Sequence, residues 1–153
     1  GEEGGTRSDQ FEKICWIVVI RMTRSVTMKP FEGKQIDTGD AILSLLDEHV
    51  VLVETKPGVT LDKQKTDKFY EIVEKQMSGN YSLVINRKND YRLMRFEVYN
   101  IANAHNRLRG IAIVTHKKVA GMMAELESPL SQKQFARFSN VDDAIAWARK
   151  LHQ

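Results

Sequence analysis

The run Gly110-Ile111-Ala112-Ile113-Val114 decides the predicted fold, because it is apolar throughout and lies between two segments with helical patterns. Such an uninterrupted run, rich in β-branched residues, is typical of a strand that is buried on both faces of a sheet. Further strands are predicted at residues 81–85 and 134–138. A segment of helical periodicity follows each of the three strands. In chain order these segments are residues 94–106, 119–126 and 141–151.

A hairpin and another helix precede these strand–helix units. Apolar runs at residues 41–46 and 50–54 flank the polar turn Asp47-Glu48-His49, which is the pattern of two antiparallel strands joined by a turn. The periodicity of residues 61–77 then predicts a helix, with Thr60 as its N-cap. Because crossovers between successive strands are right-handed, the later strands form a parallel sheet. The sequence therefore predicts an α/β fold: a four- or five-stranded mostly parallel sheet with an N-terminal hairpin, flanked by about four helices.

Length and composition indicate one folded domain. The chain has 153 residues, 42% of them apolar and 28% charged, which suits a single hydrophobic core. We assign this domain to residues 36–153 and interpret residues 1–35 as an N-terminal extension, in part disordered or foreign to the native protein. The apolar run at residues 14–20 is too short to cross a membrane as a helix, so no membrane span is expected. A single cysteine excludes an internal disulfide, and we expect a cytoplasmic location.

Several segments of the domain resemble the SpoIIAA-like (STAS) family. They are the strand at residues 50–58, the helix opening Val59-Thr60-Leu61, the strand and loop at residues 83–91, the strand at residues 111–114 and the ending at residues 138–147. The resemblance covers about residues 36–152 and implies the β-α superhelix of that family. It also implies a function in binding a protein partner or a small ligand, since such domains seldom catalyse a reaction.

The phosphorylation switch of the best-known members of the family is not expected here. In those anti-anti-sigma factors, a serine at a helix start carries the phosphate within a pattern like Asp-Ser-Ser/Thr-Gly. The corresponding loop of this chain, Lys88-Asn89-Asp90-Tyr91-Arg92, contains no serine, threonine or glycine. Anti-anti-sigma activity is therefore not part of the expected function.

Basic and polar residues follow two of the predicted strands at their carboxyl ends. In an open α/β sheet, ligands bind outside the carboxyl ends of the strands. If the strands at residues 81–85 and 110–114 are neighbours, the loops that follow them meet at one edge of the sheet. The sequence therefore predicts a site for a partner or ligand, formed by Arg87, Lys88, Asn89, Tyr91, Arg92, Thr115, His116, Lys117 and Lys118.

Three of these cations are placed unusually. Arg92, Lys117 and Lys118 lie where helices are predicted to begin, and the helix dipole favours Asp or Glu at that end. A bound anion would explain the placement, because helix-start amides together with Arg and Lys suit a phosphate or a carboxylate. The alternative is that they are solvated loop charges, in a chain with 23 lysines and arginines. The sequence leaves both interpretations open.

Catalysis, metal binding and nucleic-acid binding are not expected. The sequence contains no P-loop, no Gly-x-Gly-x-x-Gly and no Gly-x-Ser-x-Gly motif, so neither an enzyme nor a cofactor is indicated. The four histidines lack the spacing of a helical metal site. Basic residues surround Tyr91, but a net charge of +3 is low for a dedicated nucleic-acid binder.

The expected function is that of a non-catalytic, STAS-like binding or regulatory module. In the first version, the loops after the central strands contact a protein partner. In the alternative version, the same basic crevice binds a small anionic ligand, such as a nucleotide, a phosphate-bearing compound or an acyl carboxylate. Both versions place the function in the same strand-end loops.

Overall fold

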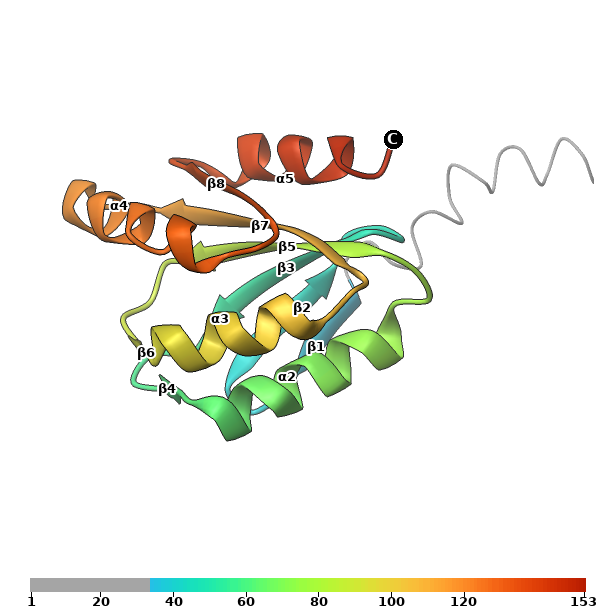
Figure 1. Cartoon of the computed structure of the whole chain (residues 1–153), viewed down its shortest axis with the longest axis horizontal. Coiled ribbons are helices and arrows are strands. Elements are labelled where there is room, and N and C mark those ends of the chain that lie inside the picture. Colours follow the sequence, from blue (N-terminus) through green and yellow to red (C-terminus); the bar gives the residue numbers. More distant parts are fainter. Residues whose placement is uncertain (1–33) are drawn as a thin grey trace, which may run out of the picture.

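A six-stranded sheet runs through the centre of the computed structural model, which describes residues 34–153 (Figure 1). The strands lie in the order β1-β2-β3-β5-β7-β8. The first three pair antiparallel, whereas β3, β5, β7 and β8 are parallel to one another. Their bounds are β1 Lys34–Asp37, β2 Ala41–Leu45, β3 Val50–Thr55, β5 Tyr81–Arg87, β7 Leu108–Thr115 and β8 Gln134–Phe138.

Helices connect the parallel strands in the described residues. They are α2 Lys63–Gln76, α3 Arg95–Ala104, α4 Lys118–Glu125 and α5 Val141–Lys150, with a short 3-10 helix, η1, at Ser128–Leu130. A small parallel pair, β4 Thr60–Leu61 and β6 Arg92–Leu93, lies directly before α2 and α3 and holds the starts of these two helices together. No helix within residues 34–153 is long and apolar enough to cross a membrane.

The central strands divide the core into two layers. α2 and α3 cover one face of the sheet, and α5 covers the other (Figure 1). Side chains of a strand alternate between the two faces. Accordingly, Leu83 and Ile111 join the core under α2 and α3, whereas Val84 and Ala112 join the core under α5. The α5 side is filled by small residues of the helix, Ala144 and Ala148, and the opposite side by the larger Tyr70, Val73 and Tyr99.

The predicted α/β class, the hairpin and the strand–helix alternation are confirmed. β2 and β3 form the hairpin, in which Ala41 pairs with Thr55 and Leu45 pairs with Val51. The last helix begins as its sequence indicates, because the side-chain oxygen of Asn140 accepts a hydrogen bond from the Asp143 N–H at 2.9 Å.

The sheet is larger than the expected four or five strands. Residues 34–37 form β1, an antiparallel edge strand on β2. This strand begins two residues before the predicted domain boundary at residue 36. Edge strands are hard to recognise in a sequence when they are this short and mostly exposed, as β1 is. The remainder of the expected N-terminal extension, residues 1–33, lies outside the described residues.

The start of α2 also differs from the prediction. Thr60 is not the N-cap, because it pairs with Arg92 in the small β4–β6 sheet. Asp62 is the N-cap, and its Oδ1 accepts a hydrogen bond from the Lys65 N–H at 3.0 Å. The pairing with β6 is a tertiary contact, which local periodicity does not reveal.

His152 makes stability depend on pH at the amino ends of the strands. Burial, and then the neighbouring His49, hold the pKa of His152 below its usual value of 6.5. Its ring stacks on His49 at 4.7 Å, and its Nε2 lies 2.8 Å from Ser82 Oγ. Since the unfolded chain binds this proton more readily, protonation favours unfolding, and stability falls as the pH drops through the ordinary histidine range.

Urea unfolding of His152→Asn and the natural chain at about pH 7.5 and about pH 5.5 checks this expectation. The natural chain should lose more unfolding free energy between the two pH values than the variant does. An equal loss in both proteins would show that His152 does not contribute to the pH dependence.

Candidate functional site

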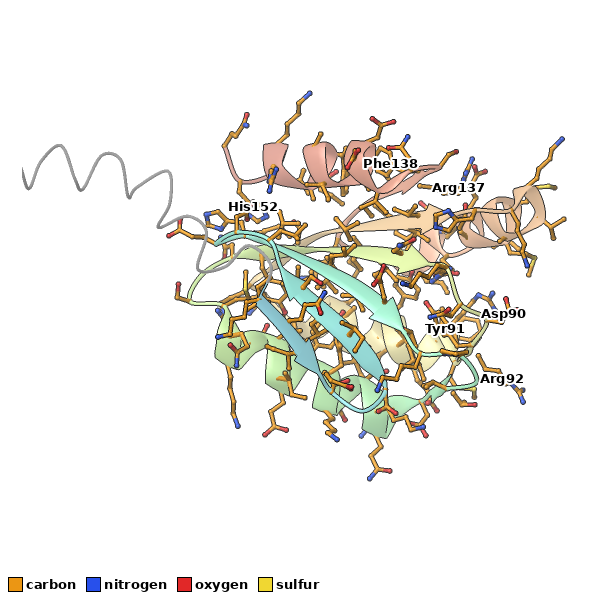
Figure 2. All side chains as sticks on the ribbon, turned by 180° about the vertical axis from the view of Figure 1, so that it is seen from behind. Asp90, Tyr91, Arg92, Arg137, Phe138 and His152 are labelled. Carbon is orange, nitrogen blue, oxygen red and sulfur yellow. The ribbon has the colours of Figure 1, made fainter. Side chains whose placement is uncertain are left out.

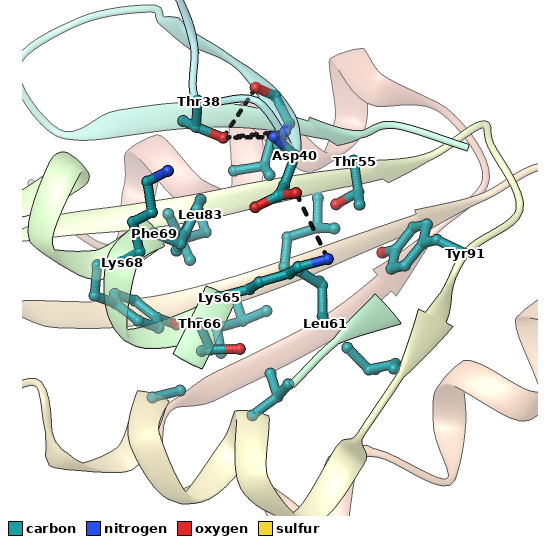
Figure 3. Close-up of a pocket in the computed structure, with 18 of the residues that line it drawn as sticks. Thr38, Asp40, Thr55, Leu61, Lys65, Thr66, Lys68, Phe69, Leu83 and Tyr91 are labelled. Atoms are coloured by element: carbon teal, nitrogen blue, oxygen red, sulfur yellow. Dashed lines mark hydrogen bonds and ion pairs between the residues drawn. The ribbon is translucent and has the colours of Figure 1, made fainter. Parts of the chain in front are cut away.

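A pocket lies between the sheet and the pair α2 and α3, toward the carboxyl ends of β3 and β5 (Figure 3). The cavity itself is small, about 60 Å³, and only the whole space between its walls, with open solvent at the mouth counted, reaches about 740 Å³. The floor is formed by the sheet residues Val53, Thr55, Leu83, Ile85 and Ile111. The walls come from the helices and from the small β4–β6 sheet, chiefly Leu61, Thr66, Phe69, Leu93, Val98 and Ala102. The position agrees with the general rule that open α/β sheets bind ligands at the carboxyl ends of their strands.

The mouth of the pocket is polar although its interior is apolar. Lys65 extends across the opening toward Asp40, and its Nζ lies 3.8 Å from the Asp40 carboxylate (Figure 3). Lys68 lies one helical turn further along α2 and also lines the pocket. The turn that carries Asp40 is fixed by Thr38, whose Oγ1 accepts hydrogen bonds from the N–H groups of Asp40 and Ala41. Two ammonium groups therefore accompany one carboxylate at the entrance.

A buried ion pair closes the pocket at the end of β5. The Nη1 and Nη2 groups of Arg87 donate to the two carboxylate oxygens of Glu127 at 2.6 and 2.7 Å. Arg87 Nε donates to the Tyr91 hydroxyl at 3.2 Å, which holds this ring against the pocket. The Tyr99 hydroxyl donates to Glu127 Oε1 at 2.6 Å. Glu127 has no exposed surface, so these partners replace all of its contact with water.

Burial and the charge of Glu127 shift the pKa values of two of its partners, Arg87 and Tyr99. Burial by itself would lower the pKa of Arg87, but the hydrogen bonds and charge of Glu127 outweigh that effect and raise it. Burial, together with the charge of Glu127, raises the pKa of Tyr99, whose hydroxyl is therefore a neutral donor. Arg87 therefore stays charged and Tyr99 stays neutral at ordinary pH, and both side chains line the pocket.

The first predicted loop is divided between pocket and surface. Arg87 and Tyr91 line the pocket. Lys88 pairs with Glu54 at 3.4 Å, and the Asn89 side chain donates to the Thr55 carbonyl at 2.9 Å, so both residues tie the loop to β3. Arg92 is exposed and lies outside the pocket, at the same end of the molecule as Tyr91 (Figure 2).

The second predicted loop lies at the same edge of the sheet but not in the pocket. β5 and β7 are neighbours, and Arg87 pairs with Thr115 in the register. Thr115 is buried, and His116 Nε2 lies 2.6 Å from the side-chain oxygen of Asn86. Lys117 and Lys118 are exposed at the start of α4. The structure therefore brings the two loops to one rim, and it brings only Arg87 and Tyr91 to the pocket.

Sequence reasoning missed the residue that organises this cluster, Glu127. It follows the apolar Leu126 and precedes Ser128-Pro129, a setting that gives no local sign of a buried carboxylate. Its role depends on Arg87, which lies 40 residues earlier in the chain. Helical periodicity likewise gives no sign that residues such as Phe69 and Val98 wall a pocket, because a stripe that faces a solid core has the same spacing. Within residues 34–153, no three His, Cys, Asp or Glu side chains gather in an arrangement that would hold a metal ion.

The chain can now be compared with known proteins. The sequence model of the SpoIIAA-like family matches residues 52–149, which is more than half of the chain. The chain belongs to the SpoIIAA-like family. This SpoIIAA-like domain is also similar to the crystal structure of an uncharacterized protein of the DUF3478 family with a SpoIIAA-like fold, from Shewanella loihica. The two share 12% identity with a TM-score of 0.50, over 75% of this chain and 90% of the other, so the likeness concerns the fold. No curated protein matches this SpoIIAA-like chain.

Proposed function

We propose that this SpoIIAA-like domain is a non-catalytic binding module for a slender small molecule with an apolar body and an anionic head. The body would occupy the pocket under α2 and α3, and the head would remain at the mouth beside Lys65 and Lys68. The observation that carries the proposal is the pocket itself, which is apolar within and polar at its entrance. Small-molecule sites are typically concave and mostly apolar, with a few polar groups that fix orientation.

The apolar lining favours the body of such a ligand. Residues of three elements face the same space, among them Phe69 of α2, Val98 of α3 and Leu83 of β5. Transfer of apolar surface from water into such a site contributes about 25 cal/mol per Å² before the costs of ordering are subtracted.

The charges at the mouth favour an anionic head. Lys65 is held near Asp40 at 3.8 Å, a distance that leaves its ammonium hydrogens available to a second acceptor. Lys68 has no ion-pair partner among the described residues. Among the anionic ligands that the sequence suggests, an acyl carboxylate matches both the lining and the mouth.

Protein-partner binding through the strand-end loops is a second candidate function. It is supported by the exposure of Arg92, Lys117 and Lys118, which lie outside the pocket and form no ion pair with other described residues. A small ligand in the pocket would leave these three cations free for another contact. The two functions are therefore compatible in one molecule.

Calorimetric titration of the full chain with decanoate, dodecanoate and tetradecanoate tests the proposed function. We expect saturable binding that strengthens with chain length, by about threefold to fourfold for each buried CH₂ group. The alcohols with the same chains should bind more weakly, because they lack the charge that Lys65 and Lys68 recognise. If no chain length binds, the pocket proposal is contradicted. If acids and alcohols of the same length bind with equal affinity, the ligand does not need an anionic head.

A further inference from the structure

The exposed large apolar side chains of this domain come from two segments, the start of α3 and the helix α4. Within residues 34–153 they are Met94, Phe96, Val119, Met122, Met123 and Leu126, with exposed fractions from 43% to 78%. Two of them flank the start of α3, and four belong to α4 or follow it directly. Arg95, which lies between Met94 and Phe96, links the two groups, because its Nε lies 3.6 Å from Glu127, the residue directly after Leu126. We call these six residues the apolar patch. Contiguous exposed apolar surface on a soluble domain usually marks an interaction site.

α4 presents its large side chains outward and its small ones inward. Positions 119, 122, 123 and 126 follow helical spacing and form one stripe on the solvent side. The buried positions are Gly121 and Ala124, which let the helix approach β7 and β8 closely. A methyl group at Gly121 would lie 2.9 Å from an Arg137 guanidinium nitrogen, so the Arg137 side chain would have to shift to admit it. Core packing therefore does not explain the large apolar residues of α4.

Cations surround the apolar patch. Lys117 and Lys118 begin α4, and Arg92 lies just before α3. Figure 2 shows Arg92 and Arg137 at the same end of the molecule, together with Asp90. Of the carboxylates of this region, Glu125 is neutralised by Arg137 at 3.0 Å, whereas Glu97 accepts from the Lys63 N–H at 3.0 Å and keeps its charge. Arg92, Lys117 and Lys118 have no such carboxylate partner among residues 34–153. The free charge around the patch is therefore mainly positive.

We infer that the apolar patch docks onto an anionic lipid surface. α4 would lie in the plane of the interface, with Val119, Met122 and Leu126 among the acyl chains and Lys117 and Lys118 at the phosphates. Apolar side chains flanked by basic residues are the pattern of interfacial helices, whose binding combines apolar burial with attraction to anionic lipids. Figure 1 shows α4 at the outer edge of the fold, where a flat surface can reach it.

A lipid surface fits the patch better than a second copy of the chain or a folded partner. A symmetric dimer through α4 would use the same patch twice and would therefore offer the basic residues around it no complementary acidic surface. The apolar side chains project from α4 and do not line a groove that could receive a partner's side chain. A bilayer needs no groove, and the flexible methionines adapt to its disordered chains.

Co-sedimentation of the full chain with lipid vesicles tests the inference. We expect binding to mixed phosphatidylcholine–phosphatidylserine vesicles, little binding to phosphatidylcholine alone, and weakening when salt is added. Val119→Ser with Met122→Ser should weaken binding by about tenfold or more, and Lys117→Gln with Lys118→Gln should also weaken it. These residues are exposed, so the variants should keep the circular dichroism spectrum and melting temperature of the natural chain.

The matched control is Lys63→Gln with Lys75→Gln, which removes the same charge from the exposed side of α2. It should bind the mixed vesicles as the natural chain does. A loss of binding equal to that of Lys117→Gln with Lys118→Gln would show that net charge alone drives binding.

Absence of vesicle binding by the natural chain would overturn the inference. So would light scattering that shows a dimer abolished by Val119→Ser with Met122→Ser. Since the patch lies outside the pocket, a pocket-filling variant such as Val98→Phe should keep vesicle binding, which separates this inference from the proposed ligand function.

Discussion

Glu127→Ala should lower the free energy of unfolding by about 3–5 kcal/mol, because it leaves the Arg87 guanidinium buried without its counter-charge. In the natural chain both carboxylate oxygens accept from Arg87, and one of them also accepts from the Tyr99 hydroxyl. The substitution removes all three acceptor contacts at once. Urea unfolding of the natural chain and the variant measures the loss. The slope of unfolding free energy against urea concentration should be the same for both proteins.

The matched control is Glu125→Ala, two residues earlier in the chain. Glu125 also pairs with an arginine, Arg137, at 3.0 Å, but its side chain is 63% exposed. Exposed pairs contribute at most about 1 kcal/mol, so this control should lose little stability. The double variant Arg87→Met with Glu127→Leu should recover much of the loss, because it removes both buried charges together. Equal losses for Glu127→Ala and Glu125→Ala would show that the cluster is not energetically distinct from a surface pair.

Val98→Phe should weaken the binding of tetradecanoate by about tenfold or more, because the larger ring occupies space that the ligand needs. Val98 lies on α3, is partly exposed and lines the pocket, so the added atoms can enter empty space with little displacement of the core. The melting temperature of the ligand-free variant should therefore stay near that of the natural chain or rise. Calorimetry and a thermal melt of the same preparations provide both values.

Ile101→Phe is the matched control on the same helix. Ile101 is also partly exposed and packs against the same core, but it does not line the pocket. This variant should bind tetradecanoate as tightly as the natural chain does. If Val98→Phe binds tetradecanoate with the affinity of the natural chain, the acyl chain does not lie in the pocket.

The layered fold could be predicted because its signals are local. The run at residues 110–114 has the composition of a doubly buried strand, and Asn140 with Asp143 marks the start of α5 within four residues. The pieces that were missed depend on pairing between distant segments. β1 acquires its strand geometry only against β2, and Thr60 is drawn into a strand only by Arg92.

The candidate site could be predicted only to its general position. The two loops do share one rim of the sheet, as expected, and Arg87 and Tyr91 line the pocket, but a binding function of this rim stays a prediction. The walls could not be foreseen, because the residues of α2 that face a pocket have the same periodicity as residues that face a solid core. α4 shows the converse problem, since Val119 and Met122 have the pattern of a buried stripe yet point to solvent.

The central claim is that an acyl chain binds between the sheet and the helices α2 and α3. Methyl-resolved NMR of the full chain with tetradecanoate tests it most directly, through contacts between the ligand chain and individual methyl groups. We expect contacts to Leu83, Ile85 and Val98, whose side chains line the pocket. Contacts confined to Met122 and Met123 on α4, with none to the pocket methyl groups, would contradict the claim.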